Sequence, residues 1–110
     1  MQVVKVRLLM LTTENGGRQN EVRSTYRPGW TWDPTEDERL LQDVMEEREG
    51  PRTGQIIEPP VVPLGVNTDV YVAPLVPEAW TTLEAGVVVF VHEGLKVVGR
   101  GVVLEPLASV

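Results

Sequence analysis

The sequence predicts an all-β domain that carries one inserted α-helix, and three observations lead to this fold class. Apolar and polar residues alternate with a period of two over several stretches. Glycine, asparagine and proline residues, which favour turns, separate these stretches. One acidic segment instead places its apolar residues at helical spacing. Several short strands and a single helix are typical of a closed barrel or a sandwich, and 110 residues fit one domain spanning residues 1–110.

The first predicted strand covers residues 3–11. Its apolar face consists of Val4, Val6, Leu8 and Met10. Asn15-Gly16 follows this strand, and an Asn-Gly pair is typical of a type I′ hairpin turn, in which both central residues have positive φ. We therefore expect residues 3–11 to pair antiparallel with a second strand over residues 22–32.

The second predicted strand places Trp30 and Trp32 on one face, at alternate positions. Pro28 withholds a backbone donor, so we expect it at an edge, a bulge or an unpaired position. The two tryptophans are expected to fill the interior of the barrel or to pack beneath the inserted helix. Stacking of these rings on nucleic-acid bases is the alternative.

Residues 34–52 interrupt the strand pattern and form the predicted helical insert. Thr35-Glu36-Asp37-Glu38 matches a capping box, Asp33-Pro34 offers a second start, and Gly50-Pro51 supplies a stop. The spacing predicts a helix over residues 35–49. Its apolar stripe consists of Leu40, Leu41, Val44 and Met45.

Four further strands are expected, at residues 53–58, 68–76, 86–92 and 96–104. The prolines between residues 59 and 63 predict an extended loop, because proline withholds ladder donors. Residues 86–92 are apolar on both faces, which predicts a strand buried on both sides. Gly99 and Gly101 allow a close approach of the neighbouring backbone.

Five motifs occur in an order that resembles a known family. They are Gly16-Gly17-Arg18, Ser24-x-Tyr26-Arg27-Pro28, Thr53-Gly54, Leu83-Glu84-Ala85-Gly86 and the closing segment from His92 to Val103, HEGLKVVGRGVV. Together they resemble the third, C-terminal domain of elongation factor Tu. The resemblance runs from about Val3 to Leu107 and is interrupted only by the helical insert. It implies a six-stranded antiparallel Greek-key barrel.

The resemblance also implies binding residues. In that family the third domain packs against the GTPase domain, contacts the T-stem of aminoacyl-tRNA and takes part in contacts with the nucleotide exchange factor. Carried over by position, the binding set is Arg18, Arg27, Thr53 and Gly94. This chain departs from the family at Gly29, where the family has a polar glutamine, and in the insert, which springs from the surface that the family uses for RNA.

Charge bears directly on the RNA reading. Residues 34–51 carry seven acidic and two basic side chains, which gives a net charge of −5, and the whole chain carries −6. Nucleic-acid binding draws most of its affinity from neutralised phosphates. Acids at this surface would repel phosphates within a Debye length of about 10 Å at roughly 0.1 M salt.

Several classes of chemistry lack their residues. The chain has no G-x-x-x-x-G-K-[ST] loop, so we expect no binding of GTP. It has no cysteine and one histidine, His92, for which a structural role is more common than general-base catalysis. We therefore expect no catalytic residue, no metal site and no cofactor.

The location follows from the hydropathy pattern. No run approaches the ~20 apolar residues of a membrane span. The N-terminal apolar run is interrupted by charges and lacks a cleavage site, so it is read as a strand and not as a signal peptide. We expect a cytoplasmic protein that does not bind membranes.

Two functions follow. The first is a non-catalytic protein-interaction module whose partner is another protein, with a role at the translation machinery suggested by the fold alone. The alternative is an RNA- or tRNA-binding domain in translation elongation that retains the family's contacts through Arg18 and Arg27. Charge placement decides between them, because a contiguous arginine face that the insert leaves open would favour RNA.

Overall fold

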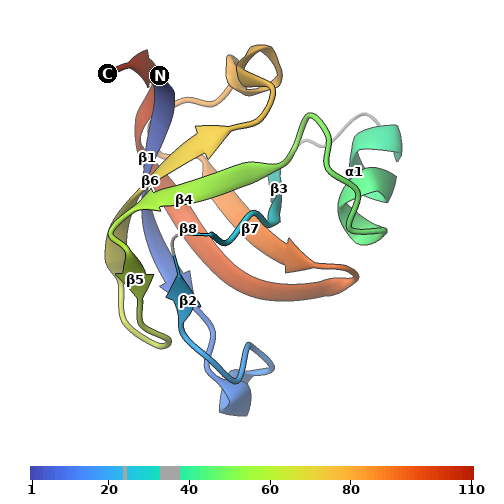
Figure 1. Ribbon diagram of the computed structural model, residues 1–110, viewed down its shortest axis with the longest axis vertical. Helices are drawn as coiled ribbons and strands as arrows, with labels where there is room; N and C mark the ends of the chain where they lie inside the picture. The colour runs from blue at the N-terminus through green and yellow to red at the C-terminus, as the bar shows by residue number, and fades with distance from the viewer. Residues whose placement is uncertain (24, 33–37) are drawn as a thin grey trace.

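The computed structural model describes residues 1–23, 25–32 and 38–110, with side chains from residue 41 onward in the last range (Figure 1). Its strands are β1 (Gln2–Met10), β2 (Val22–Arg23), β3 (Gly29–Trp32), β4 (Gly54–Glu58), β5 (Val61–Val62), β6 (Thr68–Pro74), β7 (Val88–Glu93) and β8 (Lys96–Ser109). The helices are α1 (Glu38–Met45) and two short 3₁₀ turns, Thr13–Asn15 and Pro77–Trp80. The predicted mostly-β class with little helix is confirmed.

Six strands form one curled antiparallel sheet in the order β3-β7-β8-β1-β6-β4, which makes a half-barrel (Figure 1). Strands β2 and β5 form a second, two-stranded sheet. The two edge strands of the large sheet meet at one place, which we call the seam (residues 28–30 and 52–54). There Gly29 and Thr53 form an antiparallel bridge, and the Trp30 amide donates to the Arg52 carbonyl at 2.9 Å.

The core lies on the concave side of the curled sheet. As predicted, β1 buries its whole apolar face, formed by Val4, Val6, Leu8 and Met10. Trp80 stands edge-on to both Trp30 and Trp32, at centroid distances of 6.1 and 5.0 Å. The Trp30 indole donates to the Gly54 carbonyl at 3.0 Å, so its polar atom is satisfied inside the core. The prediction that Trp30 and Trp32 pack in the interior is confirmed.

The predicted first hairpin is wrong. Strand β1 lies inside the sheet and pairs with β6 on one side and β8 on the other, so neither edge is open to residues 22–32. Those residues form two separate strands, because β2 pairs with β5 and β3 pairs with β7. Gly16 has a φ of 81°, but Asn15 ends a 3₁₀ turn without positive φ, so the type I′ turn is absent.

The predicted burial of the β7 segment on both faces is also wrong. Val89 and Val91 are buried, whereas Val88 and Phe90 point to the outer, exposed face of the sheet. The predicted close approach at the β8 glycines is confirmed. A Cβ on Gly101 would lie 2.7 Å from the carbonyl oxygen of Arg7 on β1, closer than real side chains approach.

The other predicted strands are observed with changed ends. Strands β4, β6 and β8 occupy the predicted segments at 53–58, 68–76 and 96–104, and β8 continues to Ser109. The proline-rich loop contains a short strand, Val61–Val62, that was not predicted. This strand pairs with β2, which is not part of the large sheet.

Helix α1 is shorter at its C-terminal end than the predicted 35–49. It ends at Met45, and Glu47 then takes a left-handed φ of 57° that turns the chain. The predicted start at residues 35–37 and the side chain of Leu40 lie outside the described residues. Val44 is buried and packs toward β3, while Leu41 and Met45 stay half-buried. Within the described ranges, no helix has the length and apolar character that crossing a membrane requires.

Candidate functional site

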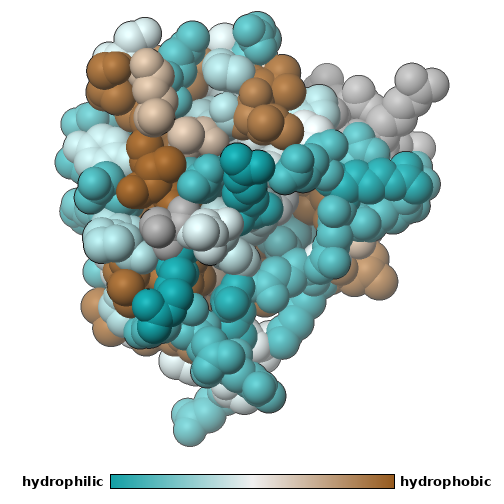
Figure 2. Space-filling model, viewed as in Figure 1, coloured by the Kyte–Doolittle hydropathy of each residue, from teal (hydrophilic) through white to brown (hydrophobic). Residues whose placement is uncertain are grey.

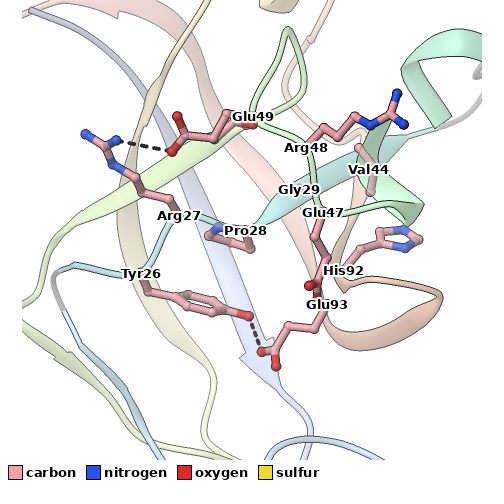
Figure 3. A pocket seen from close by; sticks show the side chains of 11 residues that line it. Tyr26, Arg27, Pro28, Gly29, Val44, Glu47, Arg48, Glu49, His92 and Glu93 are labelled. Carbon is pink, nitrogen blue, oxygen red and sulfur yellow. Dashed lines mark hydrogen bonds and ion pairs between the residues drawn. The ribbon is translucent and has the colours of Figure 1, made fainter. Parts of the chain in front are cut away.

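Two of the four predicted binding residues, Arg27 and Thr53, line one depression at the seam of the sheet, and Arg18 and Gly94 lie next to its wall. Figure 3 shows this depression with Arg27 at its edge. This seam pocket has a volume of about 310 Å³ and is lined by residues 26–29, 47–49 and 92–93 together with Val44 and Thr53. Arg27 and Thr53 line it directly, and Gly94 follows its wall at Glu93. Arg18 reaches it through a contact with Glu93. The four residues of the predicted set are therefore close to one another in the fold, although they lie far apart in the sequence.

Arg18 is held in a cluster with Tyr26 and Glu93. Its Nη1 donates to Glu93 Oε2 at 2.7 Å, and its guanidinium lies 4.5 Å from the centre of the Tyr26 ring. The Tyr26 hydroxyl donates to the same carboxylate oxygen (Figure 3). Burial, and then this hydrogen bond, raise the pKa of Tyr26 well above its usual value, so the hydroxyl remains a donor. Arg18 is thus engaged inside the protein.

Arg27 and its neighbour across the seam pocket, Arg48, are also opposed by carboxylates. Arg27 Nη1 lies 3.3 Å from Glu49 Oε1 (Figure 3), and Arg48 contacts both Asp43 and Glu46. The Arg27 pair is exposed, and exposed pairs contribute about 0–1 kcal/mol to stability. These pairs matter more for the surface charge than for stability, because each of the two arginine charges is offset by a nearby carboxylate.

Thr53 and Gly94 have structural reasons for their identity. The buried Thr53 hydroxyl accepts a hydrogen bond from the Gly50 amide at 2.9 Å, which closes the turn before β4. Gly94 has a φ of 62° in the two-residue turn between β7 and β8, a conformation that favours glycine. A Cβ on Gly94 would lie 3.5 Å from the Met45 carbonyl oxygen, so this turn sits against the end of α1.

His92 lies in the wall of the seam pocket. Its Nε2 is 2.6 Å from the Thr31 hydroxyl, and burial lowers its pKa, so the ring favours the neutral form. The described side chains contain no group of three histidine, aspartate or glutamate residues that could hold a metal ion. The expectations of no catalytic residue and no cofactor remain predictions.

A second feature escaped the sequence interpretation. Leu41 and Met45 of α1 and Leu95 of the β7–β8 turn line a depression of about 600 Å³ together with Gln42 and Glu46, which we call the helix–hairpin pocket. Leu95 is 81% exposed at the tip of the hairpin. The sequence feature that could have indicated this pocket is Leu95 itself. It is a leucine at the second position of a hairpin turn, where the resembled family has a glycine.

An open groove beside the seam pocket contains three arginines, two of which belong to the predicted binding set. Arg18, Arg23 and Arg27 line it, and its volume is about 750 Å³. Arg23 is paired with Glu21 at 2.9 Å, so all three arginines of this groove contact a carboxylate. Among the surface features described above, this groove most resembles the contiguous arginine face that RNA binding would need.

Neither a protein-family model nor a curated protein matches this chain. The resemblance to the third domain of elongation factor Tu therefore stays a prediction from sequence motifs.

Proposed function

We propose that this chain is a non-catalytic protein-interaction module. The observation that carries the proposal is a concentration of exposed apolar side chains on the β7–β8 hairpin. They are Val88, Phe90, Leu95, Val97 and Val102, each at least 36% exposed. Contiguous exposed apolar surface marks sites where proteins dock, because leaving it in water is unfavourable.

The register of the strands makes this surface continuous. Val88 lies opposite Val102, and Phe90 lies opposite Arg100, so the outward side chains of β7 and β8 form one stripe. Arg100 has no ion-pair partner within the described part of the chain, in contrast to the paired arginines of the seam. Arginine is one of the residue types that are enriched at protein–protein binding hot spots.

The resemblance to elongation factor Tu adds a setting to this proposal. In the resembled family the third domain, a six-stranded Greek-key barrel, docks to another protein domain. We therefore propose the translation machinery in the cytoplasm as the place of action. This part of the proposal depends on a likeness of motifs and is an argument by analogy.

RNA or tRNA binding is the second candidate, and one observation favours it. The predicted contact residues Arg18 and Arg27 share the open groove with Arg23. Each of these arginines would have to exchange a carboxylate for a phosphate, and the chain's net charge of −6 opposes the approach of RNA. Protein docking is therefore the better supported function.

The test is affinity capture from a lysate of the source organism, with and without nuclease, using two matched variants. Val88→Lys places a charge on the hairpin stripe, and Val66→Lys makes the same change at a similarly exposed position, since Val88 is 47% and Val66 52% exposed. We expect a captured protein that survives nuclease, is lost with Val88→Lys and is retained with Val66→Lys. Capture that disappears with nuclease, or that Arg23→Glu abolishes, would support the RNA alternative instead.

A further inference from the structure

The helix–hairpin pocket has the shape and charge of a site for one kind of partner segment. We propose that it binds a protein segment that inserts an apolar side chain between α1 and the β7–β8 turn and carries lysine or arginine beside that side chain. This inference rests on the proposed function, since it names the chemistry of a docking partner.

The centre of the pocket is apolar. Leu41 and Met45 occupy successive turns of α1 on the same face, and Leu95 approaches them from the hairpin. Figure 2 shows hydrophobic surface at the right margin of the molecule, where Figure 1 places the tip of the β7–β8 hairpin below α1. Leu95 is more exposed than any other large apolar side chain in the described residues. An anchor residue that covers it would remove the least favourable part of this surface from water.

The rim of the pocket carries an oriented carboxylate. Glu46 Oε1 accepts a hydrogen bond from Gln42 Nε2 at 2.9 Å, and Arg48 contacts Glu46 Oε2. These contacts hold the carboxylate in place, and its remaining lone pairs can still accept from a partner. A lysine or arginine is the natural donor for such a carboxylate.

The end of α1 adds negative potential at the same place. The last turn of the helix contains no basic residue, and Glu46 and Glu47 follow directly. Free carbonyl groups give a helix C-terminus a partial negative charge, which favours cations and disfavours acids. Arg48 contacts Asp43 and Glu46, and the amides of residues 46–48 cap three of the last carbonyls, so the chain offsets part of this negative potential itself. A cation from a partner would offset the rest.

The backbone conformation of Glu47 is also unfavourable for a residue other than glycine. Its φ of 57° is the left-handed conformation that glycine adopts most readily at this position after a helix. A glutamate held in that conformation keeps a carboxylate beside the β7–β8 turn, where its Oε1 would lie 3.5 Å from a Cβ on Gly94. Residues in sparsely populated backbone conformations are found more often at functional sites than elsewhere.

Charge also distinguishes the candidate occupants. Residues 38–49 contain five acidic and two basic side chains, and the whole chain carries −6. A second copy of this acidic chain is a poorer occupant than a basic segment, and RNA would be repelled. Apolar centre, oriented acid and helix terminus together point to a basic amphipathic segment.

The experiment uses three labelled synthetic peptides of equal length and helical pattern. One presents a leucine face flanked by lysines, the second presents the same leucines flanked by glutamates, and the third replaces the leucines by serines. Fluorescence anisotropy measures affinity, and amide chemical shifts in NMR spectra locate the binding surface. We expect the Leu/Lys peptide to bind, with shifts at Leu41, Met45 and Leu95, and the other two peptides to bind at least about tenfold more weakly.

Matched variants separate the apolar anchor from the charge. Leu95→Ser should weaken binding of the Leu/Lys peptide about tenfold, while Leu75→Ser, at a residue 48% exposed on another face, should leave it unchanged. Glu46→Gln with Glu47→Gln should weaken binding and reduce its dependence on salt, while Glu105→Gln should do neither.

Four results of the peptide experiments would overturn the inference. They are equal affinities for the Leu/Lys and Leu/Glu peptides, equal affinities for the Leu/Lys and Ser/Lys peptides, chemical shifts confined to another surface, and no binding of the Leu/Lys peptide up to about 1 mM. Self-association that Leu95→Ser abolishes would make a second copy the occupant and would also overturn it. A lysate protein lost with Val88→Lys but retained with Leu95→Ser would leave the proposed function standing and remove this inference alone.

Discussion

Val44 packs directly on the backbone of Gly29, and this contact fixes helix α1 to the seam of the sheet. A Cβ on Gly29 would lie 2.7, 3.0 and 3.2 Å from the Cγ1, Cγ2 and Cβ atoms of Val44. The position therefore accepts only glycine while the valine stays where it is. The absence of a side chain at Gly29 and the position of helix α1 therefore depend on each other.

The first prediction concerns this contact. Gly29→Ala should lower the free energy of unfolding by about 1–3 kcal/mol, because a β-branched valine has no free rotation to avoid the new methyl group. Val44→Ala should also destabilise the protein, yet the double variant should be more stable than the sum of the two effects allows. Urea unfolding of the four proteins measures the coupling.

A control and a contrary outcome are available for this cycle. Gly50→Ala should be nearly neutral, since its Cβ would meet only Asp43 Oδ2, at 3.5 Å. Additive effects of Gly29→Ala and Val44→Ala would show that α1 does not rest on the seam.

The sequence predicted the strands better than their pairing. Alternation identifies the buried face of β1 because a strand with one face in the core must alternate. The partner of a strand is a non-local property, and Asn15-Gly16 is a local signal that the chain uses for a turn without a hairpin. β7 was misjudged for a related reason, since Val88 and Phe90 are apolar but exposed.

The second prediction concerns Tyr26, whose pKa is raised above its usual value of 10.0 by burial and by the hydrogen bond to Glu93. Above pH 10 the unfolded chain loses this proton while the folded protein keeps it, so the folded state binds more protons and stability falls as pH rises. Denaturant unfolding at neutral pH and at several values above pH 10 should show this loss.

Tyr26→Phe is the variant that isolates the effect. It should cost about 1–3 kcal/mol at neutral pH, because the carboxylate of Glu93 loses a donor. It should also lose less stability than the natural protein above pH 10. Parallel losses in the two proteins would mean that Tyr26 does not hold its proton.

The third prediction concerns the end of α1. Glu47→Gly should raise the free energy of unfolding by about 0.5–1 kcal/mol, because glycine adopts the left-handed conformation without strain. Thermal unfolding should show this gain as a rise in Tm of roughly 2–6 °C. Glu47→Gln keeps the strained backbone and should bring a smaller rise. A fall in Tm with glycine would show that the carboxylate of Glu47 stabilises the fold.

The candidate site was only partly visible in the sequence. Position in the resembled motifs assigned Arg18 and Arg27 to one binding set, and in the structure both line the same groove, while their role in binding stays a prediction. Their carboxylate partners, Glu93 and Glu49, come from segments 75 and 22 residues away, so no local pattern could reveal that these arginines are paired. The same holds for Leu95, whose meaning depends on the helix that lies beside it.

The fourth prediction tests whether the insert decides between protein and RNA. Deleting residues 35–50 and bridging the ends with a short Gly-Ser linker removes seven acids and two arginines, so the net charge changes from −6 to −1. It also removes Glu49, the partner of Arg27, and uncovers the seam pocket. If the insert blocks RNA, the deleted protein should gain a measurable affinity for tRNA at low ionic strength, and that affinity should fall steeply with added salt. Glu49→Gln in the full chain is the milder control, because it frees Arg27 while the helix stays in place, and it should give a smaller gain. Tight binding of tRNA by the intact protein that weakens on deletion would mean that the helix helps to bind RNA, and the RNA-binding alternative would then replace the protein-interaction module.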